Sequence, residues 1–523
     1  MKIRVVNYSN ACTVHNPVVI IKGCVENYPT EIWRKHSRSS FLMMIHTQEE
    51  QDSNANEAHK LINEVPMVKL KFKVVCRLFP GENNLKFDFL GVKDTIMLTY
   101  RDRRTDYQVR LVYVICKDQD GEFQSPPGLD NSVASAVKKI SVAATVLQCV
   151  MGELLWEQKL GRRTFALESD LAGQPVVHQH RSKLTMDQTH SLGQEKLWET
   201  LAREIVSSSI GDKKVKYLAF LSSTRYQNSK RIKPFSHAHT LAMTKGHIAL
   251  GGGGLALFGT GCLWTWPDTV ASVQSRLQDS SPIDSTFYMD DSCYRGTIGG
   301  CVATTLGSVL HELGHTFDLG HTDKGIMARG FDDLDSVLTL ASERVGRKYP
   351  KGKLQPCGSF SRNTIPPAML RSNSMCSRED AGGSPRFTNV RRSDSVSKYL
   401  EEYSEKRLER SNVELTDGGG CFWSRSCALI LAHQVWIGRG KDMQELSCEG
   451  ELKVNKDRVE ACCTVMVVEL RGDKGMVKKF WEPEQPSTLV ELESDAMRPT
   501  LEKKEEWGLV AMAGCGKIRK ITL

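Results

Sequence analysis

At 523 residues the chain exceeds the length of one average domain, so we expect two or three domains, each with its own core. Apolar residues make up 40% of the chain and charged residues 25%, a balance typical of soluble globular proteins. The net charge of +8 is small for this length, and the lysines and arginines are spread out. We therefore expect no nucleic-acid partner.

Residues 1–23 contain no uninterrupted apolar stretch and no small-residue cleavage site, so they do not resemble a secretory signal. No later segment approaches the roughly 18 consecutive apolar residues that cross a bilayer. We therefore expect a cytoplasmic protein with no membrane partner, whose 16 cysteines are mostly reduced thiols. The sequence leaves the oligomeric state open.

The first part of the chain, residues 1–126, predicts a small β-sandwich. Apolar and polar residues alternate along Val68–Val74, Leu85–Phe89 and Tyr107–Val114. Alternation with a period of two residues is typical of antiparallel strands that bury one face. The pattern ends at Pro126, where we place the first domain boundary.

Residues 127–437 predict an α/β catalytic domain. Apolar residues recur at steps of four and three from Val133 to Leu154, which predicts one long amphipathic helix. Val215–Leu221 has the composition of a buried strand. Residues 344–397 are poor in apolar residues and predict a long mobile insertion in this domain.

Beyond the insertion, Cys421–Leu431 predicts a helix that packs on the catalytic domain. Two further apolar runs, Thr464–Leu470 and Trp507–Met512, predict strands of a C-terminal β-rich domain over residues 438–523. The fold class expected for the whole chain is therefore multidomain α+β, with an α/β catalytic domain between two β-rich flanks.

The segment from Val309 to Met327 carries a pattern with specific chemistry. His311 and His315 lie four residues apart on a predicted helix, so both imidazoles project from one face about a turn apart. Two imidazoles placed in this way can bind one Zn²⁺. Glu312 lies roughly 100° further around the helix, beside the metal. That place suits a general base that takes a proton from zinc-bound water.

Zinc requires a third protein ligand, and His321 is the candidate. In a continuous helix His321 would lie about 9 Å beyond His315, so the helix must end between them. Asp318 and Gly320 offer the means, since both residue types tolerate the left-handed conformation that ends a helix. An alternative stays open, in which His321 is no ligand and a later carboxylate such as Glu343 completes the site.

The motif HELGHTFDLGH resembles the metzincin signature H-E-x-x-H-x-x-G-x-x-H, with Asp318 in place of the glycine. Most of the chain also resembles a eukaryotic family of proposed zinc metallopeptidases, which share a stretch similar to Gly251–Pro267. Some members carry a jacalin-like C-terminal segment. The resemblance implies a metzincin-like fold for the catalytic domain and a Met-turn at Met327, beneath the zinc.

In metzincins an edge strand before the zinc helix pairs with extended substrate. The resemblance makes Leu255, Ala256 and Leu257 the candidates for this strand. The preceding run Gly251–Gly254 fits equally well a tight turn that allows close packing of the backbone.

These residues predict zinc-dependent hydrolysis of peptide bonds in a protein or peptide substrate. Glu312 would take a proton from the zinc-bound water and later protonate the leaving amine. Two alternatives stay open: a catalytically silent zinc module that binds protein or carbohydrate through its β domains, and a zinc hydrolase of a non-peptide amide. The presence of Glu312 favours an enzyme, because a structural zinc site has no use for a base that is not a ligand.

Overall fold

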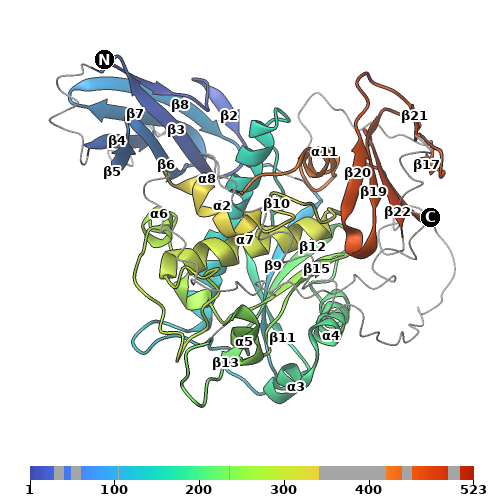
Figure 1. Cartoon of the computed structure of the whole chain (residues 1–523). Helices are drawn as coiled ribbons and strands as arrows, with labels where there is room; N and C mark the ends of the chain where they lie inside the picture. The colour runs from blue at the N-terminus through green and yellow to red at the C-terminus, as the bar shows by residue number, and fades with distance from the viewer. Residues whose placement is uncertain are drawn as a thin grey trace.

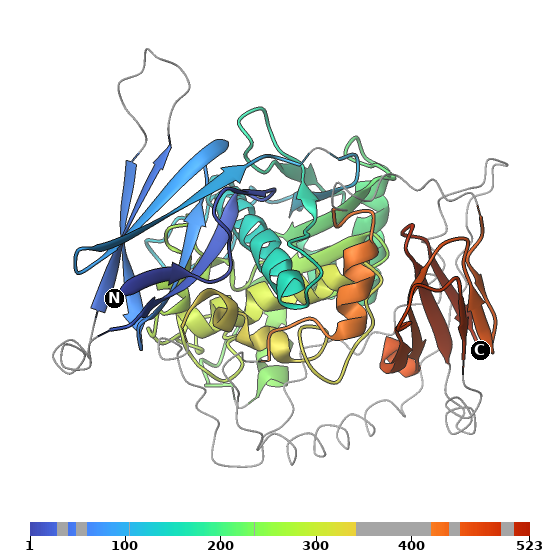
Figure 2. The same ribbon diagram turned by 90° about the horizontal axis from the view of Figure 1, so that it is seen from above.

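The structure is a computed structural model of the chain. It describes residues 1–28, 40–48, 60–103, 105–234, 236–340, 420–438, 450–492 and 507–523. Three parts follow one another across the molecule: an N-terminal sheet, an α/β body and the C-terminal sheets (Figures 1 and 2). The predicted insertion at 344–397 and the alternative ligand Glu343 lie outside the described residues.

Eight strands form the N-terminal sheet, in the order β1-β3-β6-β5-β4-β7-β8-β2. The sheet folds over a single core, because both of its halves contribute to one buried apolar cluster. The rings of Phe72 and Phe87, one from each half, lie 5.4 Å apart. The strands are β1 (Lys2–Val5), β2 (Cys12–Val14), β3 (Val18–Glu26), β4 (Ser40–Gln48), β5 (Lys60–Val68), β6 (Lys71–Arg77), β7 (Gly81–Phe89) and β8 (Val92–Tyr100).

One strand prediction for this region is wrong, and another strand is confirmed but belongs to a different sheet. The single strand expected at Val68–Val74 is broken by a tight turn at Lys69 and Leu70, whose φ angles are +49° and +62°. The strand expected at Tyr107–Val114 is β9 (Gln108–Ile115), which pairs with a strand of the α/β body and not with the N-terminal sheet. Its last residues are buried on both faces, as is usual inside a parallel sheet.

The sheet of the body has the order β10-β9-β12-β16-β15, and β11 also pairs with β9. Strands β9, β12 and β16 run parallel, whereas β15 is antiparallel to β16 and ends the order. The strand predicted at Val215–Leu221 is confirmed as β12. The other strands are β10 (Ala166–Leu167), β11 (Val177–Arg181), β15 (Ala249–Gly252) and β16 (Leu255–Gly259), with a separate pair β13 (Arg225–Tyr226) and β14 (Thr244–Lys245).

Helices cover both faces of this sheet. One face packs against α2 (Val133–Glu157) and α7 (Ile298–Thr316), and the other against α4 (Gln194–Val206). The long helix predicted from Val133 is confirmed as α2. By length and composition α2 could cross a membrane, but 67% of its most apolar stretch is buried inside the protein, as in a core helix. The shorter helices are α3 (Met186–Ser191), α5 (His237–Ala242), α6 (Val273–Leu277), α8 (Asp335–Leu338), η1 (Leu263–Thr265) and η2 (Gly330–Asp333).

The C-terminal region contains a four-stranded antiparallel sheet, β20-β19-β22-β23, and a three-stranded sheet, β17-β18-β21. Helix α11 (Arg425–His433) lies between the body and the four-stranded sheet, as the prediction of a packed helix requires (Figure 1). The elements are β17 (Lys453–Val454), β18 (Arg458–Glu460), β19 (Val465–Arg471), η4 (Asp473–Gly475), β20 (Val477–Trp481), β21 (Leu489–Glu491), β22 (Gly508–Ala513) and β23 (Ile518–Thr522).

The chain is thus a mixed α/β protein with several sheets. The domain boundaries at residues 126 and 437 stay predictions. Cys462 is disulfide-bonded, and the other cysteines that the structure describes are reduced.

Candidate metal centre

Helix α7 carries the first two histidines of the motif. The Thr297 hydroxyl caps its first turn by accepting a hydrogen bond from the Gly300 amide. His311 and His315 project from one face, and their ring centroids are 4.8 Å apart. The apolar residues of the helix pack into the body core, so both imidazoles are buried with it, at 1% and 8% exposure.

The helix ends at Thr316, between His315 and His321, as the sequence predicts. Asp318 adopts the left-handed conformation, with φ +69°. The Leu319 amide donates to the Gly314 carbonyl and the Asp318 amide to the His315 carbonyl, a pair of bonds that closes a helix at a left-handed residue. The chain therefore turns back, and this turn brings His321 to the face of α7 that carries the other two histidines.

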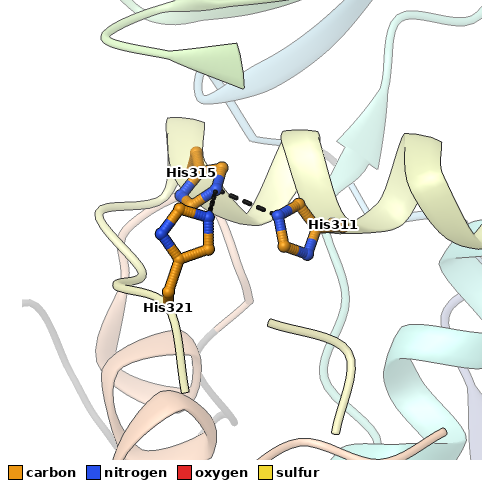
Figure 3. Close-up of side chains that lie close together, drawn as sticks. All are labelled: His311, His315 and His321. Atoms are coloured by element: carbon orange, nitrogen blue, oxygen red, sulfur yellow. Dashed lines mark hydrogen bonds between the residues drawn. The ribbon is translucent and has the colours of Figure 1, made fainter. Parts of the chain in front are cut away.

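The three imidazoles meet at their Nε2 atoms (Figure 3). The Nε2 of His315 lies 3.1 Å from that of His311 and 3.2 Å from that of His321. Each Nδ1 faces a main-chain carbonyl: Ile326 for His311, Leu319 for His315 and Lys474 for His321, at 2.7, 3.0 and 3.0 Å. A carbonyl only accepts, so each Nδ1 carries the ring proton and each Nε2 presents a lone pair.

Lone pairs that face one another repel, and a cation between them removes that repulsion. Nitrogen ligands about 2.0–2.1 Å from a tetrahedral Zn²⁺ lie roughly 3.3–3.4 Å apart, close to the distances found here. His311, His315 and His321 therefore fit zinc as ligands, and together they would supply three of the four positions of a tetrahedral ion.

Burial keeps these rings neutral, which is the form in which imidazole binds metals. Burial lowers the pKa of His311 to about 3, and the neighbouring His321 adds to the shift. Burial also lowers the pKa of His315 well below its usual value and, to a smaller extent, that of His321. Protons therefore compete weakly for the three nitrogens at neutral pH.

Glu312 lies beside this triad and is not part of it, as the helical spacing predicts. Its Oε2 accepts a hydrogen bond of 2.7 Å from the Gly251 amide of β15. A Cβ on Gly251 would lie 2.0 Å from the Glu312 carbonyl oxygen, so β15 can cross α7 at this point only with glycine. Burial raises the pKa of the Glu312 carboxyl to about 8, against the lowering effect of that hydrogen bond.

The run Gly251–Gly254 forms the tight, closely packed turn that the sequence allowed. Gly251 allows the close contact with α7, and Gly253, with φ +54°, belongs to the turn between β15 and β16. The glycine run is thus part of the site as well as a turn.

Met327 packs against α7 at Gly314. It is 1% exposed, and its Sδ is 2.8 Å from the position that a Cβ on Gly314 would take, one residue before His315. The preceding residue, Ile326, supplies the carbonyl that accepts from His311. The position suits the expected Met-turn, whose role stays a prediction.

The candidate edge strand at Leu255, Ala256 and Leu257 is wrong. These residues belong to β16, which pairs with β12 on one side and β15 on the other, so they have no free edge. Among the described strands, β15 ends the sheet next to α7. A continuous apolar run is typical of a strand buried on both faces, and this signal in Leu255–Phe258 points to the interior of the sheet.

The neighbours of His321 could not be expected from the sequence. They are main-chain atoms of Lys474, Gly475 and Val477, about 150 residues further along the chain. Every residue type carries these atoms, so no pattern in the sequence could have indicated them.

Comparison with known proteins places the chain in a family. Residues 2–420 match the family Metallopep, described as "Putative peptidase family". The chain belongs to this family. The matched segment of the chain includes α7 and all three histidines, but ends before α11 and the C-terminal sheets.

Two yeast relatives of this Metallopep chain are named as zinc metalloproteinases. "Putative zinc metalloproteinase C607.06c" of Schizosaccharomyces pombe is 24% identical over 66% of this chain and 55% of its own length. "Putative zinc metalloproteinase YIL108W" of Saccharomyces cerevisiae is 27% identical over 51% of this chain and 42% of its own length. The chain thus spans about half the length of the curated relatives it matches.

Solved structures of OgpA from Akkermansia muciniphila align with 80% of the Metallopep chain, at about 10% sequence identity and a TM-score of 0.39. One of them contains a catalytically inactive OgpA in complex with an O-glycopeptide substrate. A TM-score this low does not establish a shared fold.

Proposed function

We propose that the protein is a zinc-dependent peptidase in which His311, His315 and His321 bind the metal and Glu312 is the general base. The observation that carries this proposal is the convergence of three unprotonated Nε2 atoms, with that of His315 3.1 and 3.2 Å from the other two, next along α7 to a carboxylate outside the triad. The family and the names of the yeast relatives support it.

When bound, Zn²⁺ supplies a Lewis acid that polarises the scissile carbonyl and lowers the pKa of water. The carbonyls of Ile326, Leu319 and Lys474 keep each imidazole in the tautomer and orientation that a ligand needs. Three ligands leave one position of a tetrahedral site for substrate or water, which distinguishes a catalytic site from a closed structural one.

Glu312 transfers the protons of the reaction. Its carboxylate takes the proton from the attacking water and delivers it to the leaving amine. The Gly251 amide fixes one of its oxygens, so the carboxylate stays in one orientation beside the histidines. Burial raises the pKa of this carboxyl, which makes it a stronger base once ionised; a bound dication would act in the opposite direction.

The substrate lies along β15 in this proposal, in place of the Leu255–Leu257 segment. No described strand pairs with the outer side of β15, where the Gly251 amide bonds to Glu312, and an extended peptide can add to a sheet edge through the other main-chain groups. Such binding selects protein or peptide chains and reads little of their sequence. The edge also lies at Glu312, so a bound peptide would pass beside the base.

The test combines zinc content with cleavage of a mixed peptide library for three proteins: wild type, His321→Ala and Glu312→Gln. We expect about one zinc per wild-type chain together with cleavage, and loss of both in His321→Ala. Glu312→Gln should retain zinc and lose activity by about 10²–10⁴-fold.

Other outcomes would overturn the proposal in distinct ways. Zinc without cleavage in the wild type would favour the silent binding module. Cleavage of small amides but not of peptides would favour the non-peptide hydrolase. A wild type that binds no zinc would contradict the metal centre itself.

A further inference from the structure

We propose that the four-stranded C-terminal sheet positions the third ligand, His321, through the turn between β19 and β20 and through Arg471 and Lys520. This inference rests on the proposed function. It assigns a role to residues 471–477 and to Lys520, which lie beyond the part of the chain that matches the family. The residues concerned act through His321 and are positioning residues.

His321 is bound to this turn on both its main chain and its ring. Its amide donates to the Gly475 carbonyl at 3.0 Å, and its carbonyl accepts from the Val477 amide at 2.8 Å. Its Nδ1 donates to the Lys474 carbonyl at 3.0 Å. The turn therefore sets both the position of the residue and the direction of its Nε2 lone pair.

The other two ligands differ in this respect. The Nδ1 partners of His311 and His315 are the carbonyls of Ile326 and Leu319, which lie within 15 residues of the ligand and inside the body. His321 follows the end of α7 and gains no orientation from the helix. Its orientation depends on a segment that is distant in sequence.

A second contact fixes the residue that turns the chain back toward His321. The Asp318 carbonyl accepts a 2.7 Å hydrogen bond from the Arg471 guanidinium, and its Oδ1 pairs with Lys520 Nζ at 2.5 Å. A glycine at position 318 would also adopt the left-handed conformation, but would have no carboxylate for Lys520. The departure from the metzincin signature thus coincides with a contact to the C-terminal sheet.

The backbone conformation of the turn sets the direction of the Lys474 and Gly475 carbonyls, which accept hydrogen bonds from His321. Lys474 and Gly475 have φ angles of +60° and +71°. A Cβ on Gly475 would have no heavy atom within 4 Å, so a larger side chain there fits sterically and disturbs only the backbone conformation. Valine strongly disfavours positive φ, so Gly475→Val should move the carbonyls that bind His321 without leaving a cavity.

Gly91 provides a matched control. It lies in the turn between β7 and β8 of the N-terminal sheet, has φ +81°, and also has no heavy atom within 4 Å of its Cβ position. Gly91→Val therefore imposes a similar local strain at the other end of the molecule, away from His321.

The experiment measures zinc affinity of the full chain by competition with a chromogenic chelator, and the visible absorption of the Co²⁺-substituted protein. We expect Gly475→Val to weaken zinc binding by about 10–100-fold, the usual effect of losing a partner of a metal ligand. Its Co²⁺ spectrum should change as one histidine leaves. Gly91→Val should retain wild-type affinity and spectrum.

Asp318→Gly keeps the inference testable if Gly475→Val does not fold. Glycine accepts the left-handed conformation more easily than Asp, so the helix end should survive, while the contact with Lys520 is lost. The inference predicts weaker zinc binding; unchanged binding in a folded Asp318→Gly or Gly475→Val protein would overturn it. A wild type without zinc would instead overturn the proposed function.

Discussion

The N-terminal and C-terminal sheets both pack against the α/β body, but they meet it at different places. Asn7 and Lys22 of the N-terminal region bond to Glu153 and Glu157 of α2, and Lys73 donates to the Ser336 carbonyl of α8. None of these contacts involves the three histidines. The C-terminal sheet, by contrast, reaches the end of α7 and His321 directly.

The comparison shows that two flanks recognised as β-rich can have different tasks. Alternating apolar residues indicate the N-terminal strands and two apolar runs the C-terminal ones, and each pattern reports which faces of a strand are buried. It does not report what the ends and turns of the strands touch. The following predictions separate a flank that stabilises the body from one that also shapes the metal centre.

The largest effect is expected for Arg471→Met. Glu469 is fully buried and pairs with Arg471, so the substitution leaves a buried carboxylate without its cation and also removes the bond to Asp318. Loss of one partner of a buried pair costs about 3–5 kcal/mol. Urea unfolding should show this loss, and chelator competition should show weaker zinc binding.

Arg458→Met is the control for that substitution. Arg458 pairs with Glu460 in the same region, but both side chains are about half exposed. Exposed pairs contribute under about 1 kcal/mol, so stability and zinc affinity should hardly change. Equal losses of stability in the two variants would contradict the assignment of Arg471.

Zinc removal should affect the C-terminal flank more than the N-terminal one. At a zinc concentration about 100–1,000 times the Kd, the metal stabilises the folded state by about 3–4 kcal/mol, and a chelator removes that contribution. Amide hydrogen exchange should then rise at Asp473–Gly475 and in β20, and stay unchanged in the β7–β8 hairpin. An equal rise in amide exchange throughout the molecule would contradict a specific link between zinc and the C-terminal sheet.

A smaller effect is expected for Lys22→Met at the opposite interface. Lys22 Nζ lies 3.1 Å from the buried Glu153, which keeps Arg162 as its other cationic partner. We expect a loss of about 1–2 kcal/mol in the free energy of unfolding. Zinc affinity should equal that of the wild type, and a marked fall would show that the N-terminal flank also reaches the metal centre.

The smallest effect concerns pH. Burial lowers the pKa of His46 in the N-terminal sheet, whereas the pKa of the same side chain in the unfolded chain is about 6.5. The unfolded state therefore binds the proton first, and stability is lost as the pH falls through 6.5 toward the folded pKa. Between pH 8 and 5, the unfolding midpoint of the metal-free protein should fall less in His46→Gln than in wild type. If the two midpoints fell in parallel, His46 would not contribute to the loss of stability at low pH.

The parts of the site that follow from local geometry could be predicted from sequence. The spacing of His311, Glu312 and His315 depends only on the helical period, and the turn at Asp318 on the need to bring His321 back. Interactions between distant segments could not be predicted, because the Lys474 and Gly475 atoms that bind His321 are common to all residues.

The order of strands shows the same limit. Apolar runs on either side of the glycines predict two strands, but not which of them lies at the edge. The identity of the edge depends on pairing with β12, which is about 40 residues away in sequence. The misplaced strand at Tyr107–Val114 has the same origin, since its partner in the sheet is also β12.

In the proposed site, the bond between His321 and the β19–β20 turn would make metal binding and docking of the C-terminal sheet reciprocal. Each must strengthen the other by the same factor, because the coupling free energy is shared. A derivative that ended after α11 would keep the complete HELGHTFDLGH motif and yet lack the carbonyls that orient its last histidine. In such a chain an intact motif would not by itself mean an intact site.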